Sequence, residues 1–145
     1  MTDRALADKL SLLLTTETRS LARHLAEASP YLTLPTYAIW VSIKYLSDKS
    51  VDHAKRLSGL LEFLGISPRA AAYNADVANY HYVGLARLLP VLIEEKQRQV
   101  KAYEQAIALA SKSPKVKDVL AALEKENIEH LTQLRAAQAK LVTPA

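Results

Sequence analysis

The stretch "SVDHAKRLSGLLEFLGISP", residues 50–68, decides how this chain folds. Its leucines recur at steps of three and four residues, the spacing that gives an amphipathic helix one apolar face. Gly65 and Pro68 then end that helix. His53 falls on the same face as the leucines, so the pattern places an imidazole inside a helical core. The stretch therefore predicts a helical protein with a polar group in its interior.

The same punctuation divides the rest of the chain into helices. Good helix formers dominate the sequence, and the prolines fall mostly between periodic segments. We predict Ser113 as the N-cap of the last helix and a kink at Pro90 in the third. The predicted helices span residues 3–28, 36–64, 78–111 and 115–141.

The connections between these helices predict how they pair. The first and last connections are short, which makes each of those helix pairs antiparallel. The middle connection, "GISPRAAAYNADVAN" (65–79), is longer. A dozen extended residues reach roughly 40 Å, so it can cross the length of the bundle, or it can hold a short extra helix. We expect one all-α domain over residues 1–145.

Composition removes several classes of function. The chain of 145 residues is 50% hydrophobic but has no apolar run near the ~18 residues of a membrane span. Without cysteine it has no disulfide, thiolate metal site or cysteine nucleophile. The net charge of +4 is spread thinly, with no basic run, and no basic and apolar leader precedes the first helix. We therefore expect a cytoplasmic protein with neither a nucleic-acid partner nor a membrane partner.

Polar residues interrupt the middle of every predicted core-facing stripe. Each stripe is apolar at both ends, and a lone charge in such a core costs several kcal/mol. Interruptions at matching depth on four helices indicate that the polar groups meet one another. His24 is expected to be a packed core histidine, and His81 a surface or capping one. The predicted central polar cluster consists of Glu17, Ser50, His53, Lys96, Asn127 and His130.

Four segments resemble the helices of the ferritin-like superfamily, and of bacterioferritins and rubrerythrins most of all. The resemblance lies in "LLLTTETRSLARHL" (12–25), residues 50–68, "VKAYEQAIAL" (100–109) and "LEKENIEHLTQL" (123–134). It implies a ferritin-like four-helix bundle with a crossover between the second and third helices. In that family two irons are held by one Glu from each of two helices and a Glu-x-x-His from each of the other two. By resemblance, Glu17 would be an iron-binding Glu, and His53 and His130 the two histidines.

The departures from this pattern change what it implies. Ser50 and Asn127 stand where the two Glu-x-x-His motifs would have their Glu, and Lys96 stands at the Glu of the third helix. Hard cations need charged oxygen ligands, whereas a lysine ammonium takes the place of a cation and can pair directly with Glu17. We therefore expect a degenerate di-iron site that holds no metal and no other cofactor.

Two metal-binding interpretations stay open. A mononuclear iron or zinc site would use Glu17, His53 and His130. A shift of helix register would instead turn Glu95 and Glu126 inward and rebuild most of a di-iron centre, as in a ferroxidase or oxidase. In the other interpretation, Glu95 and Glu126 belong to an ordinary solvated helix face. The complete alternative ligand set is Glu17, His53, Glu95, Glu126 and His130.

A bundle without metal would act through its surface. The segments "YLTLPTYAIW" (31–40) and "YHYVGLARLLPVL" (80–92) are apolar around more of the helix than a monomer requires. Each is either a subunit interface or a cover for the ends of the bundle. We expect a non-catalytic role through oligomerisation, as a dimer or larger assembly, or through binding of a partner.

Overall fold

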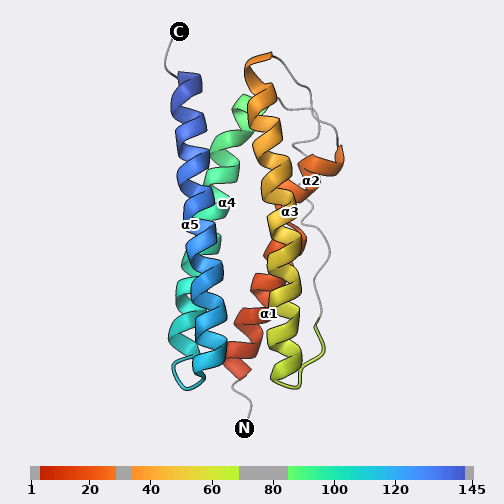
Figure 1. The fold of residues 1–145 in the computed structure, drawn as a ribbon, viewed down its shortest axis with the longest axis vertical. Coiled ribbons are helices and arrows are strands. Elements are labelled where there is room, and N and C mark those ends of the chain that lie inside the picture. Colours follow the sequence, from red (N-terminus) through yellow and green to blue (C-terminus); the bar gives the residue numbers. More distant parts are fainter. Residues whose placement is uncertain (1–3, 29–33, 69–84, 143–145) are drawn as a thin grey trace.

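The structure, a computed structural model, describes residues 4–28, 34–68 and 85–142. Within these ranges the regular elements are all helices: α1 (Arg4–Thr18), α2 (Leu21–Ala28), α3 (Leu34–Phe63), α4 (Leu85–Leu109) and α5 (Pro114–Val142). The four helices α1, α3, α4 and α5 lie side by side along one long axis, and the short α2 lies beside α3 (Figure 1). The predicted all-α class is confirmed.

Neighbouring helices in this bundle alternate in direction. α1 and α5 rise in Figure 1, whereas α3 and α4 descend. The most extensive packing joins α4 to α5 and α1 to α3, and α1–α4 and α3–α5 contacts close the bundle on its other two sides. The predicted crossover, the predicted first turns of the third helix (78–84) and His81 all lie outside the described residues.

The sequence signal at residues 60–66 ends α3 through its backbone. Gly65 has φ 80°, a left-handed conformation that glycine adopts without strain. The Ile66 amide donates to the Leu61 carbonyl and the Gly65 amide to the Glu62 carbonyl, both at 2.9 Å. This pair of hydrogen bonds is a Schellman motif, and Ile66 packs against the core after it. Gly65 thus stops the helix as the sequence indicates.

The first predicted helix, 3–28, is wrong as a single element. The chain leaves helical geometry at Arg19 and Ser20, between α1 and α2. Ser20 Oγ accepts the amide of Arg23 at 3.3 Å, which is the contact of an N-cap residue. The last predicted helix is almost unchanged, since α5 begins at Pro114, with the Ser113 carbonyl accepting the Lys117 amide. α4 continues through Pro90.

A layer of polar side chains divides the core into two apolar clusters. The cluster near the N-terminus of α1 contains Leu10, Leu57 and Leu120 among others. The cluster at the opposite end contains Leu25, Ile43 and Leu89 among others. On each long helix the buried residues between the two clusters are polar. We call this set the polar layer: Glu17, Ser50, His53, Lys96, Gln99, Asn127 and His130.

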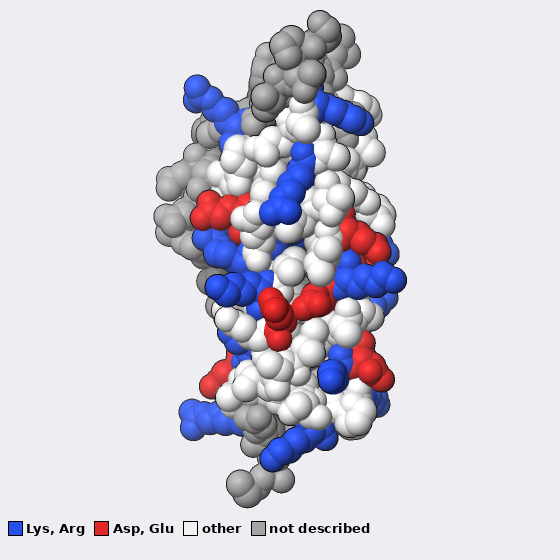
Figure 2. Space-filling view, turned by 90° about the vertical axis from the view of Figure 1, so that its left-hand side faces the viewer, with Lys and Arg blue, Asp and Glu red and all other residues white. Residues whose placement is uncertain are grey.

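The outer surface carries both signs of charge. On the face shown in Figure 2, basic and acidic side chains are interspersed and separated by uncharged residues. Among the described residues, no helix is both long enough and apolar enough to cross a membrane.

Candidate functional site

All six residues of the predicted central cluster are buried in the polar layer. Glu17 and Asn127 have no exposed surface, and even Lys96 is only 7% exposed. α1, α3, α4 and α5 each contribute at least one of these side chains, because each helix places its polar residues one or two turns from its leucines. His24 belongs to α2, and its side chain lies outside what the structure describes.

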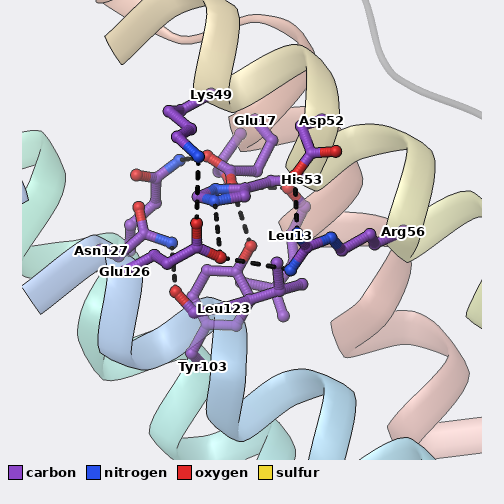
Figure 3. Close-up of polar contacts among 12 residues, drawn as sticks. Leu13, Glu17, Lys49, Asp52, His53, Arg56, Tyr103, Leu123, Glu126 and Asn127 are labelled. Atoms are coloured by element: carbon purple, nitrogen blue, oxygen red, sulfur yellow. Dashed lines mark hydrogen bonds and ion pairs between the residues drawn. The ribbon is translucent and has the colours of Figure 1, made fainter. Parts of the chain in front are cut away.

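Glu17 is the hub of the polar layer (Figure 3). Its Oε2 lies 2.5 Å from His53 Nδ1 and accepts the Tyr103 hydroxyl at 3.0 Å. Its Oε1 accepts Gln99 Nε2 at 2.8 Å. One carboxylate from α1 thus holds three donors, one from α3 and two from α4. A buried carboxylate with three donors is stabilised in its charged form.

The protonation of this hub follows from its partners. Burial alone would raise the pKa of Glu17, but the His53 hydrogen bond and the charge of Lys96 bring that pKa below its ordinary value. Burial and the Glu17 carboxylate raise the pKa of the Tyr103 hydroxyl well above its ordinary value, so Tyr103 remains a donor. An ionised Glu17 only accepts hydrogen bonds, and His53 must therefore carry a proton on Nδ1.

Lys96 does not pair with Glu17 in the way the sequence led us to expect. Its Nζ donates to Asn127 Oδ1 at 2.8 Å, and no ion pair among the described residues joins Lys96 to Glu17. Asn127 is held in turn by its Nδ2, which donates to the Leu123 carbonyl at 2.9 Å. Burial lowers the pKa of Lys96, while the charges of Glu17 and Glu95 oppose that shift. The predicted direct pair is therefore a longer-range interaction.

Gln99 is the residue of the layer that the sequence analysis missed. A stripe drawn by a step of four from Lys96 reaches Val100, which is only partly buried. A step of three reaches Gln99, which is 2% exposed. The available signal was a glutamine one turn after a lysine and one turn before a tyrosine, all on one helix face.

His130 lies next to His53 but outside the Glu17 hub. The two imidazole rings are stacked, with centroids 5.9 Å apart and planes at 16°. The ring of Tyr45 meets His130 edge-on at 5.9 Å. Burial, with the nearby charges of Lys96 and His53, lowers the pKa of His130 to about 4. His130 is consequently a neutral imidazole at neutral pH.

Glu95 faces the break between α1 and α2. Both of its carboxylate oxygens accept the Leu21 amide, at 3.1 and 3.2 Å. A carboxylate at a helix N-terminus satisfies a free amide and interacts favourably with the helix dipole. Burial raises the pKa of Glu95, although the Leu21 hydrogen bond opposes that rise. Its contact is thus with the backbone of α2 and not with the polar layer.

Glu126 lies at the outer edge of the layer, between α3 and α5. Its carboxylate is 24% exposed and contacts Lys49 Nζ at 3.5 Å and Arg56 Nη1 at 3.2 Å. Figure 3 shows Lys49 and Arg56 approaching it from opposite sides. Its Oε2 also lies 3.6 Å from His53 Nε2. Glu126 is therefore the one solvated carboxylate that reaches the histidines.

The alternative metal ligands are thus divided among three places. Glu17 lies behind His53, Glu95 binds α2, and Glu126 lies in front of the histidines. As the side chains lie, no three His, Asp or Glu residues in the described part of the chain are arranged to hold a metal ion. What the geometry provides is a buried carboxylate–imidazole pair with a second carboxylate at the solvent edge.

Comparison with known proteins adds no assignment, since neither a protein-family model nor a curated protein sequence matches the chain.

Proposed function

We propose that the chain is a ferritin-like four-helix bundle whose di-iron site has become a metal-free polar layer. Its role in this proposal is non-catalytic and depends on self-association. Support for the ferritin-like arrangement comes from the directions of the helices, since α3 and α4 run the same way while α1–α3 and α4–α5 are antiparallel pairs. The depth of Glu17, His53 and His130 on three different helices agrees with the same proposal.

One observation carries the metal-free part of the proposal. The Glu17 carboxylate already has three donors, and the amine of Lys96 is buried in the same layer. A di-iron centre needs bridging carboxylates whose oxygens are free to bind cations. Here the oxygens of the hub are used by the protein itself, and a basic group occupies the space beside them.

The exposed face of α3 supports self-association. Tyr37, Val41 and Tyr45 are 59%, 51% and 48% exposed and recur every four residues, so they form one apolar stripe on the helix. In the second predicted interface segment the described residues Leu88, Leu89 and Leu92 are buried in the core. We therefore assign the assembly surface to the α3 stripe, with a second copy of the chain as its partner.

Sedimentation equilibrium tests this assignment. We expect the wild-type chain to be a dimer or larger, and Val41→Asp to dissociate it because a carboxylate cannot be buried unpaired at the centre of an apolar stripe. Leu12→Asp is the matched control, because Leu12 is an equally exposed leucine at 49% on α1. A wild-type monomer, or equal dissociation by both variants, would reject the α3 interface.

An iron-binding or iron-oxidising protein is the second candidate. It would use Glu17, His53 and His130 with Glu95 and Glu126, and it requires Glu17 and Glu95 to leave their present partners. One observation favours metal chemistry of some kind, namely the free nitrogen of His53.

A further inference from the structure

His53 Nε2 is a buried polar atom without a hydrogen-bond partner. The side chain of His53 is 1% exposed, and its other nitrogen is bound to Glu17. Leaving a buried imidazole nitrogen without a partner costs free energy, so such an atom in a well-packed core calls for a physical explanation.

The Glu17 contact determines which proton His53 carries. Since an ionised Glu17 can only accept, Nδ1 is the donor, and in the neutral ring Nε2 keeps its lone pair. Glu17 itself is fixed by Gln99 and Tyr103. A carboxylate that binds one nitrogen of a histidine, and so points the other at a cation, is the usual support of a histidine metal ligand.

The lone pair of His53 faces Glu126. The separation of 3.6 Å between Nε2 and Oε2 is too long for a hydrogen bond. Two ligand atoms on one tetrahedral zinc ion lie about 3.4 Å apart, given metal–ligand bonds of roughly 2.0–2.2 Å. The distance therefore suits a shared cation better than a direct contact.

His130 supplies a second imidazole at the same place. Its ring centre lies 5.9 Å from that of His53, and two imidazoles on one tetrahedral ion have ring centres about 5 Å apart. A shift of the His130 ring by about 1 Å would bring its nitrogen into range. With its pKa lowered to about 4, His130 is neutral and has a free lone pair at neutral pH.

We propose that His53 Nε2, Glu126 and His130 bind a single zinc-class divalent cation between α3 and α5, with Glu17 as the carboxylate that orients His53. This site goes beyond the proposed function, because it lies on the solvent side of His53 and leaves the contacts of Glu17 with Gln99 and Tyr103 in place. Nitrogen and carboxylate ligands without thiolates suit zinc, and an open fourth position would hold water.

Arg56 and Lys49 compete with the cation for Glu126. Both contact its carboxylate now, which accounts for the absence of a ready-made three-ligand set among the described residues. Arg56 has a second carboxylate within reach, since its Nη2 lies 3.0 Å from Asp52 Oδ2. Arg56 can therefore move to Asp52 when a cation takes Glu126. The exposure of Glu126 gives the ion a path from solvent.

Titration of the full chain with Co²⁺, followed by visible absorption, tests the site. We expect one Co²⁺ per chain with the intense bands of tetrahedral coordination. Glu126→Gln should weaken binding by roughly 10–100-fold, whereas Glu129→Gln, an exposed glutamate on the same helix, should leave it unchanged. Arg56→Gln should tighten binding because it frees Glu126, and Lys55→Gln is its exposed control.

Absence of binding in both the wild type and Arg56→Gln would overturn the proposal, as would binding that Glu126→Gln does not weaken. The variants of Glu126, Glu129, Arg56 and Lys55 change partly or fully exposed side chains, so all four are expected to fold, and circular dichroism checks this. The proposed function fails on a different result, namely two bound metal ions per chain that are both lost in Glu17→Gln.

Discussion

Glu17 is the residue on which the polar layer depends most. It has no exposed surface and accepts hydrogen bonds from His53, Gln99 and Tyr103. Its burial could be predicted because it interrupts a run of leucines at core spacing. Its partners could not, because which of several polar side chains reaches a carboxylate depends on rotamers and on whether a helix turns by a step of three or four. Gln99 and the Lys96–Asn127 hydrogen bond were missed for that reason.

Glu17→Gln is expected to lower the free energy of unfolding by about 2–4 kcal/mol. A neutral amide accepts more weakly than a carboxylate, and its NH₂ group would face donors. Urea unfolding followed by circular dichroism measures the change. Glu104→Gln, an exposed position on α4, is the control and should stay within about 0.5 kcal/mol of wild type. Equal losses in the two variants would show that the hub adds no stability.

Lys96→Glu should raise the affinity of the layer for divalent metal. The change removes a buried basic group and restores a carboxylate beside Glu17, which hard cations need. Isothermal titration with Fe²⁺ under anaerobic conditions measures the affinity. Lys96→Gln separates loss of the basic group from gain of the ligand, so Lys96→Glu should bind more tightly than Lys96→Gln. If the two bind alike, position 96 does not supply a ligand.

At the scale of the element, the break between α1 and α2 shows what helical periodicity misses. Residues 3–28 keep a continuous apolar stripe, so the sequence predicts one helix. The chain breaks because Ser20 caps the second piece and Glu95, 74 residues away in sequence, binds the Leu21 amide. A serine alone is a weak stop signal, and a cap from another helix leaves no local trace. The end of α3, by contrast, was predicted because Gly65 acts locally.

Glu95→Ala should speed hydrogen exchange at the Leu21 amide. That amide donates to both Glu95 oxygens, and without them it is a free donor at a helix N-terminus. Exchange followed by NMR provides the measurement. Glu94→Ala, at the exposed neighbouring position, should leave the Leu21 rate unchanged. A Leu21 rate that is the same in both variants would mean that Glu95 does not cap α2.

At the scale of the whole molecule, the layer separates two apolar clusters and couples stability to pH. Burial lowers the pKa of His130 from 6.5 to about 4, so the unfolded chain binds more protons between these values. Its contribution is complete above pH 6.5 and is lost as pH falls toward 4. Lys96, His53, Glu17 and Glu126 face His130, and the lowered pKa of Glu17 removes further stability at lower pH.

The free energy of unfolding should therefore fall between pH 6.5 and 4, with His130 responsible for at most about 3 kcal/mol of the loss. Urea unfolding at a series of pH values measures it. His130→Gln removes this titration, so its stability should fall less steeply over the same window. The raised pKa of Glu95 acts in the opposite direction but is common to both proteins. Parallel pH profiles would exclude His130 as the titrating group.

The metal content of the protein tests the central claim most directly. The chain would be produced in iron-supplemented medium, purified without chelators or affinity metal, and measured by elemental mass spectrometry. A polar layer that satisfies itself predicts no iron pair, and an iron content that Glu17→Gln does not change. Two irons per chain, both absent from Glu17→Gln, would contradict the account and make Glu17 a ligand of a working di-iron centre.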